Sequence, residues 1–446
     1  MPPSFFLRPP RLVAVLLCTA VAAVFVLLPT GYALTSVEAV AVEGKQAVKS
    51  PSGLFWAAAS PKSLLRGVMA VFGVRPPREP WVPSGVDYGN THVPPVAEAA
   101  PVCMAWQYRP RKLTTVPKGI TVLAPTWFYV ESGSEGKAET HDLNHVLDQK
   151  ITNWDPVQYV TAAHKAGVRV WAVVSCLGQP NLAKQIVTDT EGKNRFISQV
   201  AGWVREYNLD GISFDFEKMD PADNDAFTSL VAECKQALPP GATVSVAVTV
   251  PLKNPEGNWW QSYDREGLGR VADYVAVMTY DYKDLEPTAA IGWVDGKIKD
   301  MLELVPSDKL LMGVPFYGTD FRFESPKGEK LVELPELKKS LTHVNVFPSG
   351  MKTLLGEGTL KSGSKTTEVE YWIGKGLWLE DKAAMQYSFV DKAGVLHVVY
   401  CEEERSLLAK GRLAAFRRLA GVAVWRIEKE PDTWWQALTD GMNAVN

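Results

Sequence analysis

Short apolar runs alternate with amphipathic stretches from about residue 101 to the end of the chain. Continuous apolar runs bounded by turn residues are typical of strands that are buried on both faces. They predict strands at 102–108, 120–129, 168–176, 211–217, 243–250, 274–282, 310–317 and 421–427. Between them, apolar residues on one helical face predict helices at 156–166, 195–207, 221–237, 263–271 and 291–304.

This alternation of strands and helices indicates an α/β fold. Eight strands with intervening helices are typical of a (β/α)8 TIM barrel, which is the fold we expect. An open, doubly wound sheet is the alternative. It is disfavoured, because no glycine-rich phosphate-binding loop follows the first predicted strand.

The predicted strands are evenly spaced except for the last two. The seventh ends at residue 317 and the eighth begins at residue 421, with a predicted hairpin (385–391 and 395–401) and helix (404–420) between them. We therefore expect a small α+β insertion at about 319–402. It would stand over one end of a barrel that occupies residues 101–446.

Residues 1–36 have the pattern of a targeting segment. Arg8 and Arg11 precede an apolar run at 12–28, and small residues follow it, as in a secretory signal. The run is long for a signal peptide and short for a membrane span, so a cleaved signal and a retained anchor both stay open. Proline-rich residues 37–100 predict a spacer, and we expect the remainder of the chain to lie outside the cytoplasm.

Composition and charge narrow the range of partners. The chain is 46% hydrophobic and 22% charged, with a net charge of −3. That charge gives no strong attraction to nucleic acid or to anionic lipid, so we expect no nucleic-acid partner and membrane contact only through the N-terminal segment. The 15 Trp and 14 Tyr include candidates for stacking on sugar rings, although many belong to a core. We expect a monomer.

The cysteines and histidines show no metal-site pattern. Beyond the N-terminal run, cysteines occur at 103, 176, 234 and 401, and Cys103 and Cys176 lie in apolar runs. Four buried thiols are therefore favoured over two disulfides. The six His have no ligand-like spacing, so we expect no metal and no other cofactor.

The predicted strand 211–217 ends in two acidic residues. Because side chains alternate along a strand, Ser213, Asp215 and Glu217 share one face. The opposite face carries the packing residues Ile212, Phe214 and Phe216. Two carboxylates held close together raise the pKa of one of them. A carboxyl that stays protonated near neutral pH can act as a general acid.

Other predicted strands also end in polar or aromatic residues. In a (β/α)8 barrel the carboxyl ends of the strands meet at one face, where catalytic groups lie. These ends carry Trp127, Met278, Tyr280, Asp281, Tyr317 and Trp425. Their joint placement predicts a single cleft that is suited to a sugar.

Three motifs resemble those of glycoside hydrolase family 18, the chitinase-like family. DGISFDFE at 210–217 resembles the DGxDxDxE signature, MTYD at 278–281 resembles the MxYD motif, and Trp425 matches the tryptophan of the last strand. PTWF at 125–128 and GVPFYG at 313–318 are similar to one branch, the bacterial spore-germination, cortex-lytic N-acetylglucosaminidases. The resemblance covers the whole predicted barrel.

The resemblance implies a retaining mechanism in which the 2-acetamido group of the substrate is the nucleophile. It implies that Glu217 is the general acid and later the base. Asp215 would orient the acetamido N–H, and Tyr280 would hold the acetamido carbonyl oxygen. Trp425 would form the floor under the sugar at the cleavage site, and Asp281 would help to bind that sugar. Further substrate-binding residues would be Trp127, Tyr317, Met278 and Ser213.

Some of these residues also have simpler structural interpretations. Trp127 is balanced between a core position and a sugar contact, and Tyr317 fits the cleft wall or packing behind it. Asp210 lies off the acidic face and is expected to be structural. The pair Trp259-Trp260, on a predicted loop, fits either a sugar platform or an ordinary surface patch.

Ser213 departs from the family pattern, because the signature has an aspartate there. A hydroxyl can hydrogen-bond Asp215 but adds no charge, so Glu217 is the one close carboxylate neighbour of Asp215. We therefore expect Asp215 to ionise more readily than it would beside a second aspartate. The cortex-lytic branch also tends to lack this aspartate, so its loss does not argue for an inactive enzyme.

The sequence thus predicts a secreted or membrane-tethered glycosidase that cleaves β-1,4 bonds next to N-acetylglucosamine. The resemblance favours peptidoglycan or its cortex fragments as substrate, with chitin or chito-oligosaccharide as the alternative. The rivals are a chitinase-like lectin that binds glycan without cleaving it and an inert membrane-anchored scaffold. Glu217 argues against both, because such lectins usually lose the acid at this position.

Overall fold

The structure is a computed structural model that describes residues 100–108, 113–133, 136–142, 155–251, 261–282, 285–324, 342–347, 359–362, 365–368, 376–390, 395–428 and 430–444. The predicted signal or anchor at 1–36 lies outside the described residues, and so does the spacer at 37–100 apart from its last residue. Trp259 and Trp260 also lie outside them. Over the described ranges, no helix is both long enough and apolar enough to cross a membrane.

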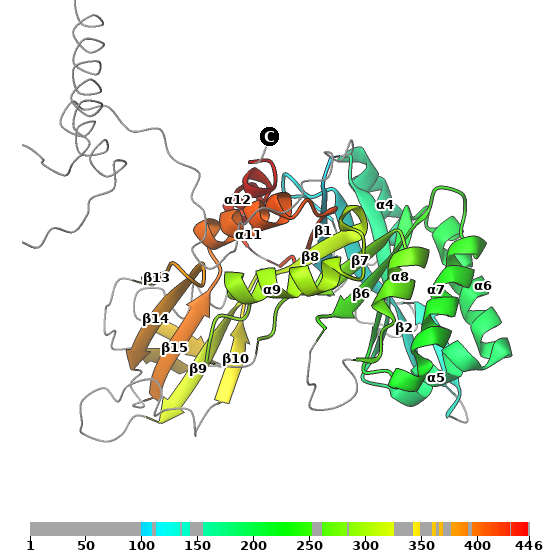
Figure 1. Ribbon diagram of the computed structural model, residues 1–446, viewed down its shortest axis with the longest axis horizontal. Coiled ribbons are helices and arrows are strands. Elements are labelled where there is room, and N and C mark those ends of the chain that lie inside the picture. The colour runs from blue at the N-terminus through cyan, green and yellow to red at the C-terminus, as the bar shows by residue number, and fades with distance from the viewer. Residues whose placement is uncertain are drawn as a thin grey trace, which may run out of the picture. The chain divides into compact units, whose positions relative to one another are not determined.

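The main body is a closed barrel of parallel strands (Figure 1). Its strands are β1 (Val102–Gln107), β2 (Val122–Ser132), β4 (Arg169–Leu177), β5 (Gly211–Glu217), β6 (Thr243–Thr249), β7 (Tyr274–Met278), β8 (Leu310–Pro315) and β16 (Gly421–Trp425). The barrel closes because β1 pairs with both β16 and β2. The predicted (β/α)8 fold is confirmed. One unpredicted strand, β3 (Ala138–Asp142), pairs antiparallel with β2.

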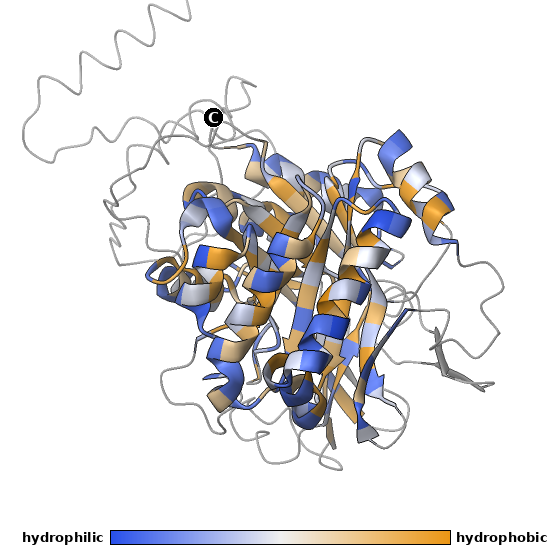
Figure 2. Ribbon diagram, turned by 90° about the vertical axis from the view of Figure 1, so that its right-hand side faces the viewer, coloured by the Kyte–Doolittle hydropathy of each residue, from blue (hydrophilic) through white to orange (hydrophobic). Residues whose placement is uncertain are grey.

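Helices cover the outside of the barrel. They are α4 (Pro156–Lys165), α5 (Pro180–Thr188), α6 (Thr190–Glu206), α7 (Asn224–Ala237), α8 (Arg265–Val271), α9 (Ile291–Leu302), α11 (Glu404–Phe416) and α12 (Asp432–Met442), with 3-10 turns at Pro221–Asp223 and Ser307–Lys309. All but α5 and α12 were predicted from the apolar periodicity. Figure 2 shows hydrophilic positions on the outer faces of these helices and hydrophobic positions nearer the strands.

The insertion between β8 and β16 forms a separate antiparallel sheet in the order β10-β9-β15-β14-β13. Its strands are β9 (Gly318–Glu324), β10 (Thr342–Val346), β13 (Leu377–Leu379), β14 (Ala384–Val390) and β15 (Val395–Cys401). The predicted hairpin is β14–β15, and a further two-stranded ladder joins β11 (Thr359–Ser362) to β12 (Lys365–Glu368). In the described part of the insertion the regular elements are all strands, so the helix of the expected α+β insertion is not among them.

The core has two layers. Inside the barrel, large and small side chains fill the space, among them Met104, Trp171, Ala247 and Leu311. A second apolar layer lies between the strands and the helices. The four cysteines at 103, 176, 234 and 401 are buried and unpaired, as predicted. Burial raises the pKa of each of these thiols, so they are inert packing groups.

Candidate active site

Aromatic packing behind β5 sets the direction in which the strand faces. Phe214 and Phe216 are 0% exposed and contact Phe196 of α6 and Phe227 of α7. The ring centroids in these pairs lie between 5.3 and 6.2 Å apart. Each buried ring stabilises the fold by ~1.5–3 kcal/mol. Since this face is fixed outward, the alternate residues of β5 must face the barrel interior.

Ser213, Asp215 and Glu217 follow one another up that inner face. Ser213 is 0% exposed and lies in register with Ser245 of β6. Asp215 and Glu217, at the carboxyl end of β5, are half-buried. The Ser213 hydroxyl has no hydrogen-bond partner among the described residues, so the possible bond to Asp215 is not formed. Its side chain is buried below the cleft, which favours a packing role over the predicted substrate contact.

The two carboxyls hold their protons more strongly than ordinary acids. Burial raises the pKa of Asp215 to about 8, and the charge of Glu217 is the second cause. Burial also raises the pKa of Glu217, with a further rise from Asp281 and an opposing effect from Lys218. The sequence predicted mutual repulsion as the cause, but burial contributes more in both cases. A carboxyl protonated near neutral pH can donate a proton to a leaving group.

Tyr280 lies two residues after the end of β7 and faces these acids. Its ring passes over Gly313 of β8, where a Cβ atom would come within 3.0 Å of the ring, so any larger residue would displace it. Burial raises the pKa of Tyr280 well above its ordinary value, and Tyr317, Asp281, Asp215 and Glu217 add to the rise. The phenol therefore stays protonated and lies close to both acids of β5.

Asp281 extends the site beyond Tyr280. Its backbone adopts the left-handed conformation, with φ 62°, and its N–H donates to Thr288 Oγ1 at 3.0 Å. Its carboxylate Oδ1 accepts a 2.5 Å hydrogen bond from the hydroxyl of Tyr317. Tyr317 is 1% exposed, which favours its packing role behind the wall over direct substrate contact. Tyr317 thus orients Asp281.

Trp425 ends β16 within an aromatic group. Its ring is half-buried and lies 6.2 Å from the ring of Trp106 and 6.3 Å from that of Tyr108. The guanidinium of Arg426 lies 5.0 Å from the Tyr108 ring and 4.3 Å from the ring of Phe347. Tyr108 and Phe347 were not predicted. Phe347 directly follows β10, so the insertion reaches the site at this point.

Trp127 does not join this group. It is 1% exposed and packs edge-to-face on Tyr159 of α4, with ring centroids 5.1 Å apart. Alternation along β2 explains the position: Ala124 belongs to the barrel interior, so Trp127, an odd number of residues later, faces the helices. The expected sugar contact of Trp127 is therefore replaced by the core alternative.

Two further predicted residues, Met278 and Asp210, lie at the cleft rim and at a structural position outside the cleft. Met278 is half-buried at the end of β7, two residues after Ala276 of the barrel interior, so it lies at the rim of the cleft. Asp210 is structural, as predicted. Its carboxylate accepts hydrogen bonds from the Val170 N–H at 2.7 Å and pairs with His164 at 2.8 Å.

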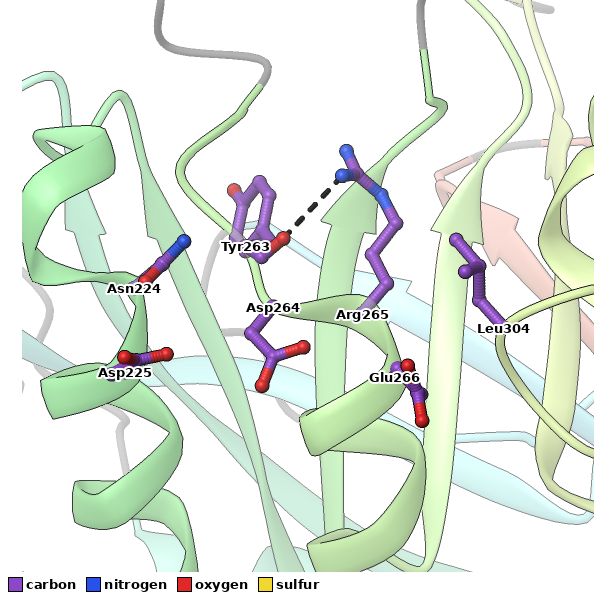
Figure 3. A pocket seen from close by; sticks show the side chains of 7 residues that line it. All are labelled: Asn224, Asp225, Tyr263, Asp264, Arg265, Glu266 and Leu304. Atoms are coloured by element: carbon purple, nitrogen blue, oxygen red, sulfur yellow. Dashed lines mark hydrogen bonds between the residues drawn. The ribbon is translucent and has the colours of Figure 1, made fainter.

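Two hollows lie near these residues. One of about 180 Å³ separates Asp281 from the insertion sheet and is lined by Asp281, Tyr282, Thr288, Thr319, Phe321, His343 and Asn345. A larger one of about 480 Å³ lies between the starts of α7 and α8 and does not include either acid of β5 (Figure 3). In the part of the chain that the structure describes, no three His, Cys, Asp or Glu side chains gather as a metal site.

The fold is similar to that of several solved structures. The chitinase from Chromobacterium violaceum matches with a TM-score of 0.61 and 18% identity, covering 77% of this chain and 99% of that one. The spore cortex-lytic enzyme SleL of Bacillus cereus matches with a TM-score of 0.58 and 20% identity, covering 78% and 76%. At these identities the likeness establishes the fold alone.

Sequence comparison adds relatives and a family. The "Uncharacterized glycosylase YvbX" of Bacillus subtilis is 28% identical over 299 residues, which cover 64% of this chain and 78% of that protein. The "Cortical fragment-lytic enzyme" of Bacillus anthracis is 25% identical over 266 residues, which cover 58% of this chain and 56% of that protein. Residues 106–430 match glycosyl hydrolases family 18. With the acids of β5, Tyr280 and Trp425 at one end of its barrel, the chain belongs to this family.

Proposed function

We propose that this chain is a glycosidase that cleaves β-1,4 bonds next to N-acetylglucosamine by a retaining, substrate-assisted mechanism. One observation carries the proposal. Asp215 and Glu217 lie together at the end of β5, burial raises the pKa of both, and Tyr280 and Asp281 lie beside them. Membership of family 18 supports the same chemistry.

Glu217 acts as the proton donor in this proposal. Because burial raises its pKa, a larger share of the carboxyl is protonated near neutral pH than in an ordinary glutamate. It gives its proton to the glycosidic oxygen as the bond to the leaving sugar breaks. The resulting carboxylate then takes a proton from the water that attacks C1, and this restores the acid.

Asp215 and Tyr280 act on the acetamido group of the substrate. The acetamido oxygen attacks C1 and forms a cyclic oxazolinium intermediate, so the protein supplies no nucleophile. Asp215 orients the acetamido N–H. Tyr280, kept protonated by burial, donates its O–H to the acetamido oxygen. Both contacts hold the nucleophile under C1, which lowers the entropic cost of the attack.

Trp425 forms the floor beneath the reacting sugar. Its half-buried ring offers an apolar face, and sugar C–H groups pack well on such faces. Tyr108, Phe347 and Arg426 extend this floor toward the insertion. Asp281, oriented by Tyr317, binds a hydroxyl of the same sugar.

The favoured substrate is peptidoglycan or its cortex fragments. The named cortical fragment-lytic relative supports this choice, and so does Ser213 at the position of the signature aspartate. Chito-oligosaccharide is the second candidate, because the MTYD motif with Tyr280 and Asp281 suits any sugar that carries an acetamido group. We also place the catalytic barrel outside the cytoplasm, supported by the basic and apolar pattern of residues 1–36. Protease added to intact cells would then digest it.

Product analysis distinguishes these substrates. The protein is incubated separately with chito-oligosaccharides and with peptidoglycan that contains muramic lactam, and products are identified by mass spectrometry. We expect reducing-end N-acetylglucosamine or muramic-lactam fragments from the second substrate in larger yield. Larger yield from chito-oligosaccharides would favour the second candidate. Binding of both glycans without any product would contradict the enzyme and favour the lectin.

A further inference from the structure

The barrel opens between β5 and β6 at its catalytic end. At the other end the two strands touch, since a Cβ atom on Gly211 would come within 2.2 Å of the Thr243 carbonyl oxygen. Their pairing extends only to Phe214 and Val246. On its other side, β5 pairs with β4 through to Glu217. The catalytic end of β5 therefore has a neighbouring strand on one side only.

Two hydroxyls from consecutive residues fill the open side. The hydroxyl of Tyr263 donates to the carbonyl oxygen of Phe216 at 2.8 Å. The hydroxyl of Ser262 donates to the carbonyl oxygen of Met219 at 2.5 Å. Tyr263 is 4% exposed and Ser262 is 0% exposed, so water does not compete for these carbonyls. The two bonds replace the sheet hydrogen bonds that β6 no longer offers, on either side of Glu217.

The backbone bends sharply between these two bonds. Lys218, directly after Glu217, has φ 60°, in the left-handed region that costs a non-glycine residue free energy. Such a conformation persists where the surroundings hold it in place. The bonds to Phe216 and Met219 bracket Glu217 and Lys218, so they fix both the bend and the direction of the Glu217 side chain.

Arg265 holds Tyr263 from the side of β6. Its guanidinium lies 5.6 Å from the centre of the Tyr263 ring and donates to the Thr249 carbonyl oxygen at 2.9 and 3.1 Å. Figure 3 shows Tyr263 and Arg265 next to each other at the start of α8, where both line the larger hollow. Because Thr249 ends β6, this segment bridges the gap between the ends of the two strands.

We propose that Tyr263, supported by Ser262, is a positioning residue that sets the place of Glu217 by fixing the peptide immediately before it. The inference rests on the proposed function. Tyr263 does not touch the substrate, and it acts through the Phe216 carbonyl. A second observation agrees with this placement: after burial, the charges of Glu217 and Asp215 are the next causes of the high pKa of Tyr263.

Replacing Tyr263 by Phe tests the inference, because the substitution removes only the hydroxyl. A small displacement of a catalytic group costs up to ~10²-fold in rate, so we expect kcat to fall ~10- to 100-fold while KM changes less than ~3-fold. The freed strand end exposes Glu217 and lowers its pKa. The alkaline limb of the kcat profile should therefore move to lower pH. Ser262→Ala should act in the same direction.

Tyr207→Phe is the matched control. Tyr207 is 6% exposed, and its hydroxyl donates to Asp142 Oδ2 at 3.0 Å, so a hydrogen bond of a buried tyrosine, here to a carboxylate, is lost away from β5. We expect Tyr207→Phe to lower the thermal unfolding temperature while its kcat and pH profile stay at parent values. If Tyr263→Phe loses only thermal stability in the same way, its role is structural and the inference is overturned.

A titration of Glu217 tests the inference about Tyr263 without any substrate. The carboxyl is followed by NMR in protein labelled at glutamate, with Glu217→Gln identifying its signal. We expect a lower pKa for Glu217 in Tyr263→Phe than in the parent, and an unchanged pKa would overturn the inference. Absence of turnover by the parent protein on both glycans would instead contradict the proposed function, so the two failures are distinguishable.

Discussion

Replacing Asp215 by Asn should stabilise the protein, and more strongly as the pH rises. Burial and Glu217 raise the pKa of Asp215 from 3.8 to about 8. Between these values the folded state binds a proton that the unfolded state has lost, so stability falls with increasing pH. The parent protein keeps this contribution to its stability in full below the unfolded pKa of Asp215. It has lost all of the contribution above the folded pKa. Asn is neutral throughout, and the loss disappears.

The magnitude follows from the pKa difference. Each pKa unit corresponds to ~1.4 kcal/mol, so three pH units between about pH 5 and pH 8 set a ceiling of ~4 kcal/mol. Two effects keep the measured difference below this ceiling. Asp215 is only half-buried, and Glu217 ionises more readily once its neighbour is neutral. We therefore expect the gap between Asp215→Asn and the parent to widen by ~2–4 kcal/mol over this range.

Thermal unfolding at several pH values between about 5 and 8 measures this gap. Asp225→Asn is the control, because it makes the same substitution at an exposed carboxylate of α7. Its difference from the parent should stay constant with pH. A constant difference for Asp215→Asn as well would refute the reasoning, since it would mean that the carboxyl is not held protonated by the fold. Catalysis should be lost, because the proposed mechanism needs the Asp215 carboxyl to orient the acetamido group; a gain in stability at the expense of activity is common at active sites.

Three further substitutions test the site. Ser213→Asp should add a third carboxyl to the face that carries Asp215 and Glu217, raise the pKa of Asp215 further and shift the pH–rate profile; an unchanged profile would contradict this account. Tyr317→Phe removes the hydrogen bond to Asp281 and should lower kcat/KM ~10-fold or more, while parent-level kcat/KM would show that Asp281 needs no support. Trp425→Ala should weaken glycan affinity at least ~10-fold by calorimetry, and unchanged affinity would exclude it as the floor.

The sequence predicted the parts of the molecule that depend on local pattern. The strand period of two placed Ser213, Asp215 and Glu217 on one face, and the fixed geometry of parallel strands placed Tyr280 and Trp425 at the same end of the barrel. Three short elements of the main body were missed: the helices α5 and α12, although their buried apolar residues lie on one face, and the strand β3. α5 spans only Pro180–Thr188, and β3 carries the polar sequence AETHD.

Contacts between distant segments could not be read from the chain. Phe347 reaches Arg426 only because the insertion sheet packs near β16, and Tyr263 reaches Phe216 only because β5 and β6 separate. The burial that dominates the pKa values of Asp215 and Glu217 also depends on the assembled barrel. Trp127 is a further case, because β2 is irregular between Thr126 and Phe128, and both Trp127 and Phe128 belong to the layer against the helices.

Loss of turnover in Glu217→Gln tests most directly the central claim that Glu217 is the general acid. The amide keeps the size of the side chain but cannot donate the proton, and loss of a general acid typically costs ~10²–10⁴-fold in rate. Glu303→Gln, at an exposed residue directly after α9, is the control and should keep the parent rate. We expect Glu217→Gln to fold, to bind the glycan and to release almost no reducing ends. Release at the parent rate would contradict the account.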